Sequence, residues 1–233
     1  MGISVPAREL SAQVFRGPPA AVTKPVATLC DRISPGQTPL YVSFAQQGGT
    51  KPHMCFENVR TIAAKLGGHA EYGWLIWEWK DNYLEAEHHA VWNRDGKLVD
   101  VTPQSPSRAR VLFLPEPGRC FDFEGRRRID NLRVPLRNDA KVREYLHLSA
   151  RCIEIEELNS SGGDVVLSAD AHFERDRIRY RLRTIERGMA LWSLNRMGRN
   201  DSCWCGSGRK FKSCCRAEDG RPATPHAAVR ATP

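Results

Sequence analysis

Four cysteines lie within thirteen residues near the end of the chain, and this cluster constrains its segment more than any other feature of the sequence. They are Cys203, Cys205, Cys214 and Cys215. Four thiolates fill the tetrahedral shell of a Zn²⁺ ion and leave no open position for a reacting water. Gly206 and Gly208 permit the chain reversal that would return the second cysteine pair to the first. Because so short a segment has almost no core, the sequence predicts one structural zinc ion that stabilises residues 198–216.

The residues around these cysteines carry a family resemblance. The segment reads GRNDSCWCGSGRKFKSCC from Gly198 to Cys215. It closely resembles the SEC-C motif, a short zinc module of the SecA translocase C-terminus that is appended to many other bacterial proteins. Family members often have Pro where Ser202 and Trp204 stand and His where Cys215 stands, and neither departure removes a ligand. The resemblance implies that the module docks onto other proteins or the ribosome.

A second candidate site starts at Cys55. Residues 54–66 have apolar side chains at helical spacing and are followed by Gly67, which predicts a helix that begins at the cysteine. The first turn of a helix places partial positive charge beside a thiol and favours the thiolate. A cysteine nucleophile also needs a histidine as base and a polar group that orients the histidine.

The predicted strands over 86–93 and 97–102 supply both partners, because the first contains His88 and His89 and the second contains Asp100. The Asp95-Gly96 pair between them is a strong hairpin signal. Side chains alternate between the two faces of a strand, so a loop of two or four residues puts His89 on the same face as Asp100. A three-residue loop would favour His88 instead. We therefore predict a site made of Cys55, His89 and Asp100.

The order Cys, His, Asp, on a helix followed by antiparallel strands, resembles the transglutaminase-like branch of the papain-like cysteine enzymes. The matching segments are 55–59 (CFENV), 89–92 (HAVW) and 98–103 (LVDVTP). The family's usual His-x-Trp is here His-x-x-Trp. The resemblance implies that Cys55 attacks a carbonyl, that His89 moves the proton and that Asp100 orients the imidazole. It also implies a protein or peptide substrate, with hydrolysis, deamidation or cross-linking as the outcome.

Two other functional hypotheses stay open. Free cysteine is among the most buried residue types, so Cys55 could be structural and the protein a non-catalytic zinc adaptor that binds protein or ribosome. The formal net charge of +8 favours an anionic partner, and nucleic-acid binding through an arginine-rich helix is the third reading. Six arginines accompany that helix, but steps of two spread them around it: Arg175, Arg177, Arg179, Arg181, Arg183 and Arg187.

The predicted organisation is an α+β fold of the papain-like or transglutaminase-like kind. Residues 1–27 are expected to be a disordered lead-in and 217–233 a disordered tail. The α+β domain is expected over 28–136, with further strands at 74–80 and 110–114. A helical extension follows over 137–197, with helices at 138–158 and 170–195.

The second of these helices carries an apolar seam that needs the preceding helix, the core or another subunit as a partner. Its members are Ile178, Leu182, Ile185, Met189 and Trp192. The chain has no apolar run of the roughly 20 residues that cross a bilayer and no apolar signal segment, so we expect a cytoplasmic protein without membrane insertion.

Overall fold

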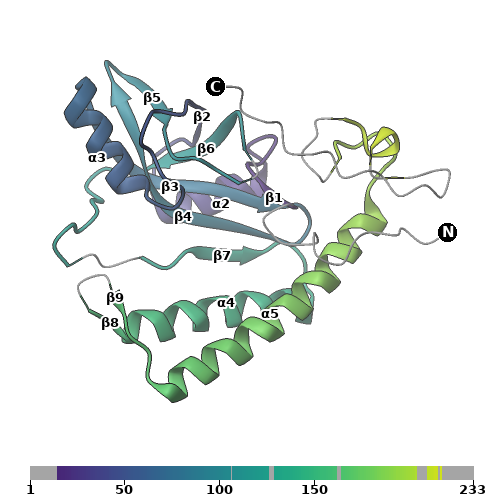
Figure 1. The fold of residues 1–233 in the computed structure, drawn as a ribbon. Coiled ribbons are helices and arrows are strands. Elements are labelled where there is room, and N and C mark those ends of the chain that lie inside the picture. The colour runs from purple at the N-terminus through teal and green to yellow at the C-terminus, as the bar shows by residue number, and fades with distance from the viewer. Residues whose placement is uncertain are drawn as a thin grey trace.

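The computed structural model describes residues 15–105, 107–125, 129–161, 164–203, 209–214 and 216. Within this part of the chain lie four α-helices, which are α2 (Lys24–Ile33), α3 (Cys55–Leu66), α4 (Ala140–Leu158) and α5 (Ala169–Arg196). A short 3-10 helix, η1 (Phe211–Ser213), follows them. Together with the sheet described next, these helices confirm the predicted α+β class (Figure 1).

The main sheet has seven strands in the order β1-β3-β6-β2-β5-β4-β7, and β3 also pairs with β4. The strands β2 to β6 therefore form a closed sheet. All pairs are antiparallel except β2 with β5. The strand bounds are β1 (Arg16–Gly17), β2 (Leu40–Phe44), β3 (His69–Trp79), β4 (Tyr83–Arg94), β5 (Lys97–Asp100), β6 (Arg110–Pro115) and β7 (Leu132–Pro135). A separate small hairpin joins β8 (Ser160–Ser161) to β9 (Asp164–Val165).

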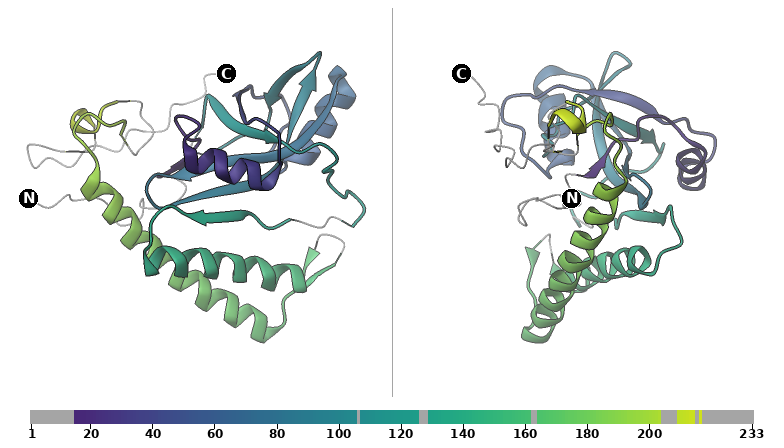
Figure 2. Two further views of the ribbon diagram at one scale, coloured as in Figure 1. Left: turned by 180° about the vertical axis from the view of Figure 1, so that it is seen from behind. Right: turned by 90° about the vertical axis from the view of Figure 1, so that its right-hand side faces the viewer.

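The two faces of the long β3–β4 hairpin bury different partners, because neighbouring side chains point to opposite faces. Leu75 and Trp77 pack with Val91, Phe113 and other residues of the closed sheet. Trp74 and Ile76, on the opposite face, pack against α2, which lies across this face in Figure 2. Residues of α3 cover the other end of that face, around Ala90 and Trp92. The hairpin therefore holds both helices in place.

Helices α4 and α5 form an antiparallel pair beside β7 (Figure 1). The predicted seam of α5 finds its partners within the chain. Its first half packs on Cys152 and Ile155 of α4, and its second half, through Ile185 and Met189, joins a cluster with Trp79. The preceding helix and the core together cover most of this seam, whereas Trp192 at its end is half-buried and lies against Arg137 and Arg196.

Residues 15–27 correct the predicted lead-in. Arg16 and Gly17 pair with the end of β3, and α2 begins at Lys24 with Pro25 in its first turn and with a fully buried Val26. Proline suits this position because its fixed φ matches the helix and its missing N–H would have no intrahelical acceptor there. The folded unit therefore begins before residue 28, and the expectations for 1–14 and 217–233 lie outside the described residues.

Strand β7 adds a segment that the sequence did not predict, and β3 and β4 are longer than expected. Residues 132–135 pair with residues 83–86 at the edge of β4. In the part of the chain that the structure describes, no helix combines the length and apolar character needed to cross a bilayer.

Candidate functional site

Cys55 is the first residue of α3, as the sequence predicts, and its side chain is almost covered, with 8% of the residue exposed. Backbone N–H groups in the first turn of a helix have no intrahelical acceptor. They also concentrate the positive end of the helix dipole at this point. The fold thus places the Cys55 sulfur where a negative charge is favoured.

The hairpin between β4 and β5 positions the other two predicted residues. Arg94 pairs with Lys97 across a two-residue loop, and Asp95 and Gly96 have φ of 54° and 79°. This left-handed backbone is typical of the tight turns that match strand twist. His89 Nε2 lies 3.1 Å from Asp100 Oδ1, with both side chains buried. The same oxygen accepts a 3.0 Å bond from the backbone N–H of Thr102, which fixes the carboxylate.

His89 stands between the thiol and the carboxylate. Burial lowers the pKa of His89, but the charges of Cys55 and Asp100 and the hydrogen bonds to both raise it well above its ordinary value. Because one ring nitrogen faces Asp100, the other is available to Cys55. The structure therefore brings Cys55, His89 and Asp100 together in one buried constellation.

His88 points away from this group, as strand parity predicts. Its ring lies 5.0 Å from that of Phe56 and 5.4 Å from that of Trp74. Burial, and then the charge of Arg119, lower the pKa of His88 to about 4. This histidine is a neutral part of an aromatic cluster at neutral pH.

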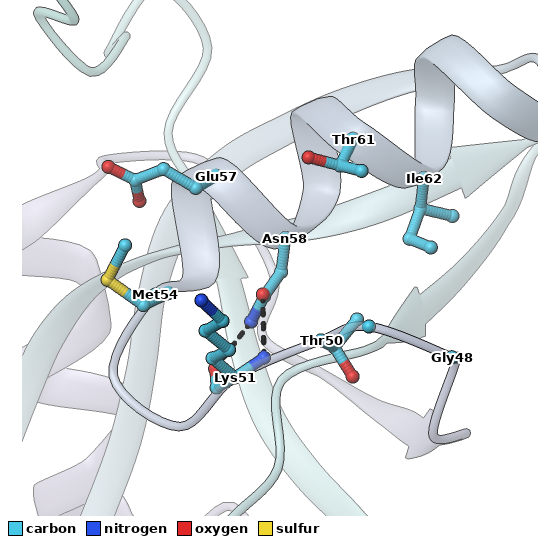
Figure 3. A pocket seen from close by; sticks show the side chains of 9 residues that line it. Gly48, Thr50, Lys51, Met54, Glu57, Asn58, Thr61 and Ile62 are labelled. Carbon is cyan, nitrogen blue, oxygen red and sulfur yellow. Dashed lines mark hydrogen bonds between the residues drawn. The ribbon is translucent and has the colours of Figure 1, made fainter.

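Asn58, one turn after Cys55, is a positioning residue that the sequence analysis missed. Its side-chain amide accepts from the Lys51 N–H at 2.9 Å and donates to the Lys51 carbonyl at 2.7 Å, as the dashed lines in Figure 3 show. It also donates to Thr102 Oγ1 at 3.2 Å. One buried amide therefore ties α3 to the loop before it and to the segment after Asp100. A buried Asn within an apolar helical stripe is the signal that could have revealed this role.

A cavity of about 200 Å³ lies between α3 and the loop that precedes it (Figure 3). Met54 lines this cavity, whereas Cys55, His89 and Asp100 do not. The other lining residues come from the preceding loop and the helix: Gly48, Gly49, Thr50, Lys51, Glu57, Asn58, Thr61 and Ile62. The cavity thus adjoins the helix start without containing the thiol.

On the other side, the segment after β6 covers α3. The Phe121 ring stacks on Phe56 with 4.1 Å between ring centroids, and the Arg60 guanidinium lies 4.1 Å from the centre of the Phe123 ring. No role of this segment was predicted from the sequence. Its aromatic residues account for part of the burial around the start of α3, and its Cys120 is exposed.

Two of the four predicted zinc ligands lie in the described part of the chain. Cys203 is buried and Cys214 half-buried, and both join the cluster that contains Trp79. The Cys203 N–H donates to the Arg209 carbonyl at 2.8 Å, next to an isolated antiparallel bridge between Ser202 and Lys210. Arg209 Nη2 donates to Cys214 Sγ at 3.3 Å, a contact that suits a thiolate.

Cys205 and Cys215 lie outside the described residues, and within the residues that the structure describes no group of three or more metal-binding side chains is found. The buried Cys203, its hydrogen bond to Arg209 and the presence of Cys214 in the same cluster fit a cysteine-bound metal. The remaining two ligands rest on the sequence.

Comparison with known proteins places one part of the chain. Residues 199–217 match the SEC-C motif, which confirms that resemblance for the C-terminal segment. The protein translocase subunit SecA of Clostridium botulinum (strain Okra / Type B1) is 29% identical over 100 residues, a stretch that covers 43% of this chain and 10% of SecA. The chain thus spans only about a tenth of this relative. No solved structure matches the chain.

Proposed function

We propose that the protein is a cysteine-dependent hydrolase or acyl transferase of papain-like or transglutaminase-like architecture, which acts on amide or peptide bonds of a protein or peptide. The observation that carries the proposal is the 3.1 Å contact between His89 and Asp100, with Cys55 at a helix start on the other side of the imidazole. An imidazole held by a carboxylate beside a thiol is the arrangement that activates a cysteine nucleophile.

The chemistry follows from this order of groups. Cys55 Sγ attacks the substrate carbonyl carbon with its proton held by His89, whose raised pKa favours the imidazolium, and the N–H groups at the start of α3 stabilise the oxyanion. His89 then gives the proton to the leaving amine as the C–N bond breaks, and a thioester with Cys55 remains. Water or a second amine attacks this thioester, with His89 as base, and releases the acid or a new amide. Asp100 keeps the imidazole in place throughout.

Selective labelling tests the proposal, because Cys120 offers an internal control. Iodoacetamide alkylates thiolates, and mass spectrometry separates the peptides that contain Cys55 and Cys120. We expect Cys55 to react despite its low exposure, and to lose at least about tenfold in rate in His89→Ala, while Cys120 reacts equally in both proteins. A folded protein in which Cys120 reacts and Cys55 does not would contradict the proposal.

We also propose that residues 198–216 hold one structural Zn²⁺ ion through Cys203, Cys205, Cys214 and Cys215. A zinc ion bound there would cross-link the four cysteines and so stabilise a segment that has little apolar core. The matches to the SEC-C motif and to SecA support a docking role for this module toward another protein or the ribosome. In this second candidate function the protein is an adaptor whose Cys55 is structural.

Two variants distinguish the two candidate functions by their effects on binding. Cys55→Ala removes the nucleophile but leaves the zinc module intact, whereas Cys203→Ser removes a ligand 148 positions away along the chain. If binding to purified ribosomes survives the first substitution and is lost with the second, the adaptor function is supported. If neither substitution changes binding, the module has no docking role there.

A further inference from the structure

We propose that the outer face of α5 binds single-stranded nucleic acid. Six residues of this helix follow one another at alternating steps of four and three, and all six are exposed. We call them the outer stripe: Phe173, Arg177, Tyr180, Thr184, Arg187 and Leu191. They lie on a different face from the apolar seam, and they span about 27 Å of helix.

The structure divides the arginines of α5 into two sets with different roles. Arg179 Nη2 lies 2.8 Å from Glu156, and Arg181 Nε lies 2.7 Å from Glu144, so both are neutralised by α4. Within the described residues, Arg177, Arg183 and Arg187 have no carboxylate at ion-pair distance. The sequence spacing alone distributes all these arginines around the helix. Among the described residues, the fold leaves Arg177, Arg183 and Arg187 without an ion pair, and these three lie on or beside the outer stripe.

The two aromatic residues of the outer stripe are unusually exposed. Phe173 is 71% exposed and Tyr180 is 69% exposed, and Arg177 lies between them. Bases stack on aromatic side chains and arginines contact phosphates, and an alternation of the two serves a single strand because its bases are unpaired. A duplex keeps its bases stacked and would leave the rings of Phe173 and Tyr180 without a partner.

Two symmetric pairings of the outer stripe with a second copy of this chain would bring like charges together. An antiparallel pair centred on residue 182 would place Arg177 opposite Arg187 of the other copy. A parallel pair would set each of these arginines against itself. Like charges in direct opposition are unfavourable in both pairings, whereas an anion would neutralise these arginines.

Fluorescence anisotropy with labelled 20-nucleotide oligouridine and oligothymidine tests the proposal on the full chain. Neutralisation of three phosphates predicts a slope near −2 for log affinity against log salt. The triple variant Arg177→Gln, Arg183→Gln, Arg187→Gln should flatten this slope, and Phe173→Ala with Tyr180→Ala should weaken binding about tenfold or more. The two oligonucleotides distinguish RNA from DNA, and either one with this pattern supports the proposal.

The matched control is Arg151→Gln, Arg179→Gln, Arg181→Gln, which removes the same charge from arginines that have carboxylate partners. It should bind as the unmodified protein does, with circular dichroism as the check that all variants are folded. Equal losses in both triple variants would reduce the effect to net charge and overturn the proposal. The proposal would also be overturned if the protein did not bind at low salt, or if it bound duplex RNA with equal affinity. A third contrary result is displacement of the oligonucleotide by polyglutamate together with no effect of the aromatic substitutions. That result would favour an acidic protein as the partner.

Discussion

Two consecutive histidines show how one strand gives the same residue type opposite properties. His89 faces Cys55 and Asp100, and its pKa is raised well above its usual value against the effect of burial. His88 faces Phe56 and Trp74, and burial dominates, so that its pKa falls to about 4. The difference arises from the alternation of strand side chains, which sends one imidazole toward charge and the other toward aromatic rings.

The raised pKa of His89 predicts a measurable dependence on Asp100. We expect Asp100→Asn to lower the pKa of His89, because the amide has no charge to stabilise the imidazolium. Since the folded pKa lies above the unfolded value, the contribution of charged His89 to stability is full below about 6.5 and is lost as pH rises through the raised pKa. NMR titration of labelled histidine measures the shift. An unchanged His89 pKa in Asp100→Asn would show that the carboxylate does not control the imidazole.

The lowered pKa of His88 predicts the opposite pH dependence. Unfolded His88 takes up a proton near pH 6.5 and folded His88 only near pH 4, so the unfolded state gains stability as pH falls through this window. The variant His88→Phe keeps an aromatic ring beside Phe56 and should lose less unfolding free energy than the unmodified protein between pH 6.5 and 4. Urea titrations at both pH values measure this, with the exposed His147→Phe as control. Equal acid sensitivity in all three proteins would contradict the assignment.

At the scale of elements, Ser193 adds hydrogen bonds to the apolar packing that attaches α5 to the sheet. Its Oγ accepts 3.0 Å hydrogen bonds from Trp79 Nε1 and from Asn82 Nδ2. The change Ser193→Ala removes only the hydroxyl and leaves both donors without this acceptor, so we expect a loss of about 2 kcal/mol or more in unfolding free energy. Thr184→Val, which replaces a hydroxyl by a methyl group on the exposed face, should cost much less. Similar urea midpoints for the two variants would show that this contact does not anchor the helix.

The elements that could be predicted are those with a strong local signal. Helices α3, α4 and α5 follow from apolar spacing, and the β4–β5 turn follows from Asp95-Gly96. Helix α2 was missed because its composition is ordinary, although Pro25 after Thr23 marks its start. Strand β7 was missed because four residues of mixed polarity become a strand only through pairing with Tyr83 to Ala86.

The candidate site also has one part that follows from the sequence and another that depends on the folded chain. Strand parity brings His89 to Asp100, since a two-residue loop determines which faces meet. The support around them depends on contacts between distant segments, such as Asn58 with Thr102 and Phe56 with Phe121. No spacing rule in a single sequence joins residues that are 44 or 65 positions apart, so these partners could be found only in the folded chain.

At the scale of the whole molecule, the C-terminal segment is packed on the rest of the fold and does not stand apart from it. Cys203 and the fully buried Phe211 join one cluster with Trp79 of the sheet and with Met189 and Leu194 of α5. A metal that orders the segment would therefore also hold the C-terminal half of α5. The N-terminal half of the helix has a separate support, since Ile178 packs on α4.

The separate support of the two halves of α5 predicts which part of the helix would be destabilised by the loss of zinc. The purified chain should contain about one zinc per molecule, and Cys203→Ser or a strong chelator should speed amide hydrogen exchange in residues 185–196 while 173–182 keep their protection. Phe211→Ala should reproduce much of this effect with the ligands intact, because it removes the same packing against Met189. Mass spectrometry of peptides from both halves measures the exchange. If exchange in 185–196 does not respond to the metal but responds to Phe211→Ala, packing alone holds the segment in place. If neither change affects this exchange, the cluster does not couple residues 198–216 to the helix.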